Sequence, residues 1–375
     1  MSRTVRLRVE PPAPAWAGTM SFQIPRALVE RFGWEARIGP GGDLTIAASP
    51  GVLSPEHARV VREHAAFTDA PPLSARLPVS YRRAPAWARS TVASVIGRRR
   101  RGRADQWAAF PGWPLDLTAD LLADLAGAPR VDLGDRTPML LTHDIDSAEG
   151  LDTLVKEFLP REEAAGARSA SYVVPCAWPL DHDLLEDVRK RGHEIGVHGY
   201  DHGNRTPFAR QSERWRRLDA ARPFSTRYGA AGYRAPSLLR TRALLRDLRP
   251  RYEYDSSIPT SGGLFPVPNN GCATARPFLV EGIVEIPLTL PRDGSLRFLG
   301  HSPKEILRLW IDCAETISRA GGVVVLLTHC EARFSGNPAM LEAYDRFLDH
   351  VRGASRFAFS TPADLLPRIK AGLSR

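Results

Sequence analysis

Short apolar runs alternate with amphipathic segments along the second half of the chain, and this alternation constrains the fold more than any other feature. Strands that alternate with helices form parallel βα units. Seven or eight such units in about 240 residues predict a distorted (β/α) barrel, with its chemistry at the carboxyl ends of the strands. The eight runs typical of strands are Met139–Thr142, Ala170–Val174, Glu194–His198, Ala231–Arg234, Tyr252–Asp255, Ile283–Ile286, Val323–Thr328 and Phe357–Ser360.

The clearest helical signal lies between the sixth and seventh of these runs. Ser302 is a suitable N-cap, and Glu305 completes a capping box with it. Pro303 occupies the first helical position, where its missing N–H costs nothing. Apolar residues then recur at helical spacing, so the sequence predicts a helix over Ser302–Ala320.

The first hundred residues have a less regular pattern. Val5–Val9 alternates like a strand and Pro25–Phe32 has a short helical pattern, but proline pairs interrupt this stretch. Helical spacing returns at Leu117–Leu125. We therefore expect an accessory region of uncertain fold over residues 1–105, followed by a catalytic barrel domain over residues 106–375.

Arginine dominates the positive charge of the chain, whose formal net charge is +9, and five arginines form one run, Arg98–Arg103. Such a run suits a solvated loop, or contact with nucleic acid, an anionic lipid or a phosphorylated substrate. The aromatic platforms and base-reading motifs of nucleic-acid-binding proteins are missing around it. We therefore do not expect nucleic acid as a partner, and peripheral membrane contact through this run stays as an alternative to a solvated loop.

The N-terminus bears on where the protein is expected to be found. No apolar run approaches the roughly 20 residues that span a bilayer. The charged residues at the start of the chain are followed by no apolar segment of the kind found in signal peptides. We expect a cytoplasmic location, with the inner face of the membrane as an alternative.

Polar side chains follow the first and third strands of the predicted barrel. Asp144 and Asp146 end the first run, and His198 and His202 follow the third. Two imidazoles four residues apart can face one metal ion, although Asp residues after strands are also common turn formers. One Asp with two His gives three ligands and open positions, as in hydrolytic zinc enzymes and in non-haem iron oxygenases. The ligands alone therefore do not fix the reaction.

Polar residues at other strand ends extend this candidate site. Asp144 offers a general base, and His329 offers a general acid. Arg234 is placed to pair with Asp144 and keep it ionised. Asp255 could hydrogen-bond His329 and raise its pKa. The alternatives are a structural histidine, a surface arginine and a capping aspartate.

The order of these motifs resembles the polysaccharide deacetylase superfamily, the NodB-homology or carbohydrate esterase family 4 enzymes, over roughly residues 135–370. The chain departs from the family pattern where Asp144-Ile145-Asp146 replaces the usual adjacent pair, and where Gly199 replaces the usual Ser or Thr. The five corresponding motifs are Thr142–Asp146, His198–His202, Arg234-Ala235-Pro236, Asp255 and Leu327-Thr328-His329.

The resemblance implies a distorted (β/α) barrel that removes an acyl group by attack of a metal-bound water. Zn²⁺ is the first expectation for the divalent ion, with Co²⁺, Ni²⁺, Mn²⁺ and Fe²⁺ as alternatives. The implied roles are metal ligand for Asp146, His198 and His202, base for Asp144, acid for His329, orientation of Asp144 for Arg234, tuning of His329 for Asp255, and oxyanion contact for the backbone N–H of Ser237.

The DxD form of the first motif is similar to branches of the superfamily that act on small or lipid-linked substrates. We therefore expect removal of an acyl group from a sugar or glycoconjugate that is nucleotide- or lipid-linked. The first expectation for the acyl group is N-acetyl. The alternatives are a deformylase, a cyclic amide or ureide hydrolase, and a catalytically silent carbohydrate-binding scaffold.

Overall fold

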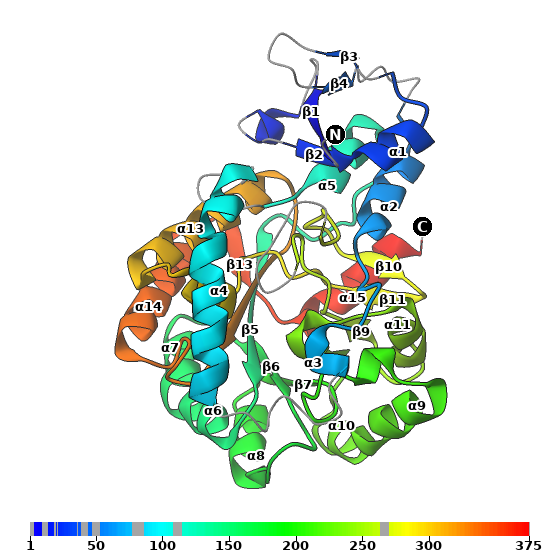
Figure 1. Ribbon diagram of the computed structural model, residues 1–375. Helices are drawn as coiled ribbons and strands as arrows, with labels where there is room; N and C mark the ends of the chain where they lie inside the picture. The colour runs from blue at the N-terminus through cyan, green and yellow to red at the C-terminus, as the bar shows by residue number, and fades with distance from the viewer. Residues whose placement is uncertain are drawn as a thin grey trace.

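A large curved sheet wrapped by helices forms the body of the protein, and a smaller sheet lies beside it near the N-terminus (Figure 1). This architecture is seen in a computed structural model. The structure describes residues 4–9, 14–18, 20, 22–35, 37–38, 44–46, 53–76, 86–107, 115–262 and 270–374.

The large sheet has nine strands in the order β10-β11-β9-β8-β7-β6-β5-β12, and β13 also pairs with β5. Every pairing is parallel except that of β10 with β11. The eight predicted strands of this sheet are confirmed, and β10 is the strand of this sheet that the sequence analysis missed. Their bounds are β5 (Thr137–Ile145), β6 (Ser169–Val173), β7 (Glu194–Val197), β8 (Gly232–Tyr233), β9 (Tyr254–Asp255), β10 (Phe278–Val280), β11 (Ile283–Glu285), β12 (Val324–His329) and β13 (Phe357–Phe359).

The sheet curls into a distorted barrel, as predicted, and the segment that follows β11 bridges its open side. The N–H of Leu290 donates to the carbonyl of Val325 on β12 at 3.1 Å. The hydroxyl of Thr289 donates to the carbonyl of Val323 and accepts the N–H of Val325. These bonds replace a regular ladder, so β11 and β12 are joined without being paired strands.

Helices cover the outer face of the barrel (Figure 1). The predicted helix after Ser302 is confirmed as α13, and its capping box with Glu305 is present. A π-helical turn, Leu154–Phe158, separates α6 from α7. The bounds are α5 (Thr118–Leu125), α6 (Ala148–Thr153), α7 (Leu159–Ala164), α8 (His182–Lys190), α9 (Gln211–Ala220), α10 (Arg222–Tyr228), α11 (Arg242–Leu248), α12 (Asp293–Leu299), α13 (Pro303–Arg319), α14 (Pro338–Gly353) and α15 (Pro362–Leu373).

Strand β5 has a core on both of its faces, which explains its nearly continuous apolar sequence. Successive side chains of a strand point to opposite faces. Leu141 packs in the cluster beneath the helices, and Leu140 packs in a second cluster inside the barrel. By the same alternation, His143 faces the helices and Asp144 faces the barrel interior. The strand therefore delivers its carboxylate to the inside of the barrel.

The described part of the N-terminal region forms a four-stranded sheet and four helices. The sheet has the order β2-β1-β4-β3, and β1 and α1 match the strand and the helix expected from the sequence. The domain boundary predicted after residue 105 lies inside α4, so the division into two domains stays a prediction. The bounds are β1 (Thr4–Val9), β2 (Phe22–Pro25), α1 (Arg26–Arg31), β3 (Arg37–Ile38), β4 (Leu44–Ile46), α2 (Pro55–His64), α3 (Leu73–Arg76) and α4 (Ala86–Trp107).

The arginine run Arg98–Arg103 lies on α4, so the expectation of a solvated loop is wrong. This helix runs along the barrel and packs on α12 (Figure 1). Within the described ranges, no helix combines the length and the apolar composition that crossing a bilayer requires.

Candidate metal and proton-transfer site

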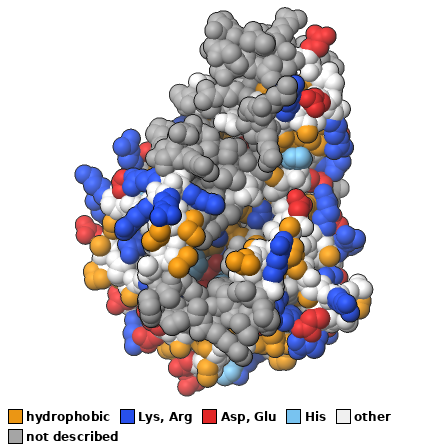
Figure 2. Space-filling view, viewed as in Figure 1, with side chains coloured by type: hydrophobic (Ala, Val, Ile, Leu, Met, Phe, Trp, Pro, Cys, Tyr) orange, Lys and Arg blue, Asp and Glu red, His pale blue; other side chains and the backbone are white. Residues whose placement is uncertain are grey.

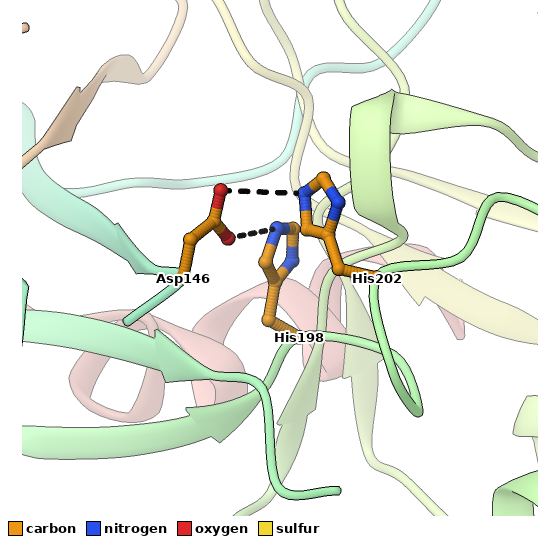
Figure 3. Close-up of side chains that lie close together, drawn as sticks. All are labelled: Asp146, His198 and His202. Atoms are coloured by element: carbon orange, nitrogen blue, oxygen red, sulfur yellow. Dashed lines mark ion pairs between the residues drawn. The ribbon is translucent and has the colours of Figure 1, made fainter. Parts of the chain in front are cut away.

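Three predicted ligands come together at the carboxyl ends of β5 and β7. Asp146 follows β5, while His198 and His202 lie in the loop after β7. Nε2 of His198 is 3.6 Å from Oδ1 of Asp146, and Nε2 of His202 is 3.4 Å from Oδ2 of the same carboxylate (Figure 3). The three donor atoms all lie within 4.8 Å of one another, which is close enough for a single cation to contact each.

The hydrogen bonding of His198 fixes which ring nitrogen can bind a cation. Its Nδ1 lies 3.0 Å from the carbonyl oxygen of Arg234. A carbonyl only accepts, so Nδ1 carries the proton and Nε2 presents its lone pair. Nε2 is buried and has no hydrogen-bond partner among the described residues. An orphaned imidazole nitrogen beside a carboxylate and a second imidazole fits a divalent cation such as Zn²⁺.

The loop that carries both histidines needs a glycine directly after His198. Gly199 has φ +71°, and a Cβ placed on it would lie 2.5 Å from the ring of Pro236. The Ser or Thr usual in the family would therefore clash here, which gives a physical reason for this departure. His202 itself has a positive φ of 55°, so the two imidazoles converge through a tight loop.

Asp144 lies beside this cluster and pairs with a fully buried arginine, as the sequence analysis predicted. Nη1 of Arg234 donates to Oδ1 of Asp144 at 3.0 Å, and Nε donates to the carbonyl of Ser256 at 2.9 Å. The guanidinium also stacks on the ring of Tyr172, 4.0 Å from its centroid. Burial alone would raise the pKa of Asp144, but His198, Arg234 and the neighbouring His329 hold it below its usual value.

His329 ends β12, directly opposite Asp144 in the register of β12 on β5. The predicted partner of His329 was Asp255, and this prediction is wrong. Nδ1 of His329 instead lies 2.8 Å from Oδ1 of Asp293, whose Oδ2 accepts the N–H of His329 at 2.7 Å. Burial opposes protonation, but Asp293, with smaller contributions from Asp144 and Asp146, raises the pKa of His329 to about 9.

Asp255 ends β9, where its neighbour in the barrel wall is Glu285 on the adjacent strand β11. Its carboxyl group interacts with that of Glu285 on β11, and its Oδ1 accepts the hydroxyl of Ser257 at 2.7 Å. The Ser257 hydroxyl in turn accepts the N–H of Ala235, next to Arg234. Burial and the Asp255 charge raise the pKa of Glu285 well above its usual value, so Glu285 carries the proton of the pair. This pair supports the turn that holds Arg234.

Asp293 is the site residue that the sequence analysis missed. It is fully buried, and it also accepts the hydroxyl of Ser335 at 2.7 Å. Its only sequence signal is a Pro-Arg-Asp-Gly segment at the start of α12, where an aspartate is usually a cap. The remaining predicted residue, Ser237, is exposed in the turn after β8, with φ 53° and ψ 18°.

The protein shares its fold with solved structures, although no protein-family model and no curated protein match the sequence. A Mycobacterium smegmatis protein assigned to the polysaccharide deacetylases matches with a TM-score of 0.50 and 19% identity, over 64% of this chain and 92% of its own. A Pseudomonas aeruginosa PAO1 protein with the same assignment matches with a TM-score of 0.51 and 14% identity, over 68% and 97%. The chain has the polysaccharide deacetylase fold.

Puue allantoinase has the polysaccharide deacetylase fold too, with a TM-score of 0.52 and 15% identity, over 69% of this chain and 98% of its own. In (β/α) barrels, catalytic groups lie at the carboxyl ends of the strands. Asp146, His198 and His329 follow or end their strands at that face. The cluster therefore occupies the position at which this type of barrel carries its chemistry.

Proposed function

We propose that the protein is a metal-dependent hydrolase that removes an acyl group from a sugar or glycoconjugate. Of the acyl groups, N-acetyl is the first expectation. The observation that carries the proposal is the convergence of three cation-binding side chains with two proton-transfer groups. Asp144, with a lowered pKa, is charged at neutral pH, and His329, with a raised pKa, is protonated. A base and an acid with opposite protonation states suit amide hydrolysis, which needs one proton removed and one delivered.

Asp146, His198 and His202 would hold the ion, because their donor atoms converge and Nε2 of His198 already presents its lone pair. A bound divalent ion such as Zn²⁺ polarises an acyl carbonyl and makes a water molecule more acidic. Asp146 contributes the single negative charge of this ligand set. Ser147, the next residue, caps α6 and donates to the buried carboxylate of Glu331 at 2.8 Å, which fixes the chain directly after Asp146.

Asp144 accepts a proton from the attacking water as the new carbon–oxygen bond forms. Arg234 keeps that carboxylate oriented, and the N–H of Ser237 contacts the carbonyl oxygen as it becomes negative. When the carbon–nitrogen bond breaks, His329 delivers its Nε2 proton to the leaving nitrogen. The acyl group leaves as a carboxylic acid, and Asp293 stabilises the imidazolium before that transfer.

The proposed substrate class rests on the names of two structural neighbours and on the DxD form of the first motif. An acylated sugar agrees with the naming of two neighbours as polysaccharide deacetylases. We infer that the sugar is attached to a nucleotide or a lipid, and that the enzyme acts in the cytoplasm or at the inner face of the membrane. A cyclic amide, as in the allantoinase neighbour, is the alternative outcome of the test.

A release screen with zinc-loaded protein tests the proposal. The probes are N-acetyl and N-formyl sugars linked to nucleotides or lipids, together with allantoin, and the readout is acetate, formate or ring opening. Asp144→Asn and His329→Ala should lose turnover and retain zinc, whereas His198→Ala should lose both, as measured by elemental analysis. Full zinc occupancy in the His198 variant would overturn the ligand assignment, and turnover of allantoin alone would replace the acyl-sugar substrate.

A further inference from the structure

Helix α4 exposes apolar side chains directly before its arginines. Val92, Val95 and Ile96 are 60%, 48% and 40% exposed. They account for three of the six large hydrophobic residues that are exposed within the described part of the chain. Apolar groups that gather on one helix in this way are typical of an interaction surface.

The exposed side chains of α4 form one stripe with a basic border. Val92, Val95 and Ile96 share a helical face, because residues three and four apart are neighbours on a helix surface. Arg99 continues this face one turn further on, and Arg98 and Arg100 project on either side of it. All three of these arginines are exposed. We call this surface, Val92 to Arg100, the α4 stripe.

The opposite face of α4 is fixed to the barrel, so the direction of the stripe is set. Gly97 is buried, and α4 packs on α12. Arg101 donates to the carbonyl of Gly300 at 3.2 Å, just after α12, and pairs with Glu305 on α13 at 2.8 Å. Figure 2 shows Lys and Arg side chains gathered with hydrophobic ones along the side of the molecule where α4 runs.

We propose that the α4 stripe docks the protein on an anionic phospholipid surface. The three β-branched side chains enter the boundary between headgroups and acyl chains, and the arginines contact lipid phosphates. An arginine can bury its aliphatic stem beside the apolar stripe while its guanidinium stays at headgroup level. This pairing of chemistries fits a membrane interface and does not depend on the proposed catalytic activity.

Helix α12 lies between the α4 stripe and the candidate site. Helix α12, on which α4 packs, begins with Asp293, the partner of His329. Helix α3 contacts the loop that carries His198 and His202, here called the metal loop. The side-chain amide of Asn204 in this loop donates to the hydroxyl of Ser74 at 3.2 Å. One helix, α12, therefore separates the α4 stripe from the pair of Asp293 and His329.

Two other occupants fit the stripe less well. A second copy related by a twofold axis would place the arginines of one stripe against those of the other if the helices are parallel, which is repulsive, or against its valines if they are antiparallel, which desolvates the charges without a partner. A nucleic acid would satisfy the arginines, but it would leave the valines and the isoleucine against a polar backbone. Anionic lipid satisfies both halves of the surface.

Flotation of the full-length protein with vesicles tests the proposal. The probes are phosphatidylcholine vesicles with and without about one third phosphatidylglycerol, at about 0.1 M and 0.5 M salt. The variants are Val92→Ser/Val95→Ser/Ile96→Ser and Arg98→Gln/Arg99→Gln/Arg100→Gln. Arg189→Gln/Arg246→Gln/Arg352→Gln is the matched control, because it removes the same charge from exposed positions on other helices.

We expect the wild type to bind only the anionic vesicles, and more weakly at high salt. The arginine variant should bind about a hundredfold less tightly, at about fivefold per arginine, and the apolar variant should bind at least tenfold less tightly. The control should bind like the wild type, and all variants should keep the wild-type circular dichroism. An equal loss of vesicle binding in the control would show that net charge alone drives binding, and this would overturn the proposal. Vesicle binding of the apolar variant at the wild-type level would overturn it too. Concentration-dependent dimerisation abolished by the apolar variant, without vesicle binding, would assign the stripe to a second copy instead.

Discussion

The carboxylate of Asp293 holds His329 at two points, its Nδ1 at 2.8 Å and its backbone N–H at 2.7 Å. A group whose folded-state pKa is raised keeps its proton until the pH rises through that value, here about 9. His329 is therefore protonated at neutral pH and can act as an acid, because Asp293, 36 positions earlier in the chain, holds its proton.

Replacing Asp293 by Asn should lower the pKa of His329 by at least one unit, because the negative partner is lost while burial still opposes the charge. Titration of ¹³C-labelled histidine by NMR in the zinc-loaded protein measures this value directly, with His329→Ala to assign the signal. The matched control is Asp255→Asn, which the structure places away from His329 and which should leave its pKa unchanged. A larger shift in the Asp255 variant would restore the partner expected from the sequence.

The sequence predicted the elements of the barrel well and some of the site geometry poorly. Apolar runs define β5 and β12 because both strands are buried on two faces, and the motifs at their ends supplied Asp146 and His329. The partner of His329 could not be predicted, since Asp293 reaches it through the segment that bridges β11 to β12. An aspartate at the start of a helix resembles an ordinary cap until that bridge is known.

Helix α4 was missed for a different reason. Over residues 90–101, where its side chains are described, the inward face is made of Ala93, Ser94 and Gly97, and the large apolar side chains face outward. Hydrophobic periodicity detects a helix by the side that it buries. A helix that packs through small residues and presents arginines to solvent gives no such signal, so the run was interpreted as a loop.

Removing the buried guanidinium of Arg234 should destabilise the protein by about 3–5 kcal/mol, because Asp144 would then remain in the barrel without its cationic hydrogen-bond partner. The variant Arg234→Met keeps much of the side-chain volume, so the change isolates the lost charge and its four hydrogen bonds. Urea denaturation measures the free energy of unfolding. Arg308→Met, at an exposed ion pair on α13, should leave the transition where it is. An equal loss of unfolding free energy in the two variants would show that the buried pair of Arg234 and Asp144 stabilises the protein no more than an exposed ion pair does.

The glycine after His198 allows a test of the metal loop by matched substitutions. Gly199→Ala should cost about 1–2 kcal/mol for its positive φ and about 1–3 kcal/mol more for the clash with Pro236. Gly229→Ala has the same backbone cost, with φ +65°, and no neighbour within 4 Å. Zinc affinity should fall in the Gly199 variant alone, because the clash displaces His198. Equal zinc affinity of the two variants in a competition titration would show that the loop tolerates the extra methyl group.

The protonated pair of Glu285 and Asp255 should make the stability of the barrel depend on pH. In the folded protein the pKa of Glu285 lies well above its ordinary value of 4.5, owing to burial and the charge of Asp255, so the folded state binds one proton more than the unfolded state above that pH. The free energy of unfolding therefore falls as the pH rises above about 4.5, by up to about 1.4 kcal/mol per unit for one proton.

Glu285→Gln removes this dependence, because the amide can still donate to Asp255 and accept the N–H of Ile258. Its stability relative to the wild type should increase between pH 5 and pH 7, while the difference stays constant below about pH 4. Urea denaturation at each pH measures both proteins, and groups elsewhere in the chain contribute equally to the two curves. Parallel curves across this range would mean that Glu285 is ionised in the folded protein.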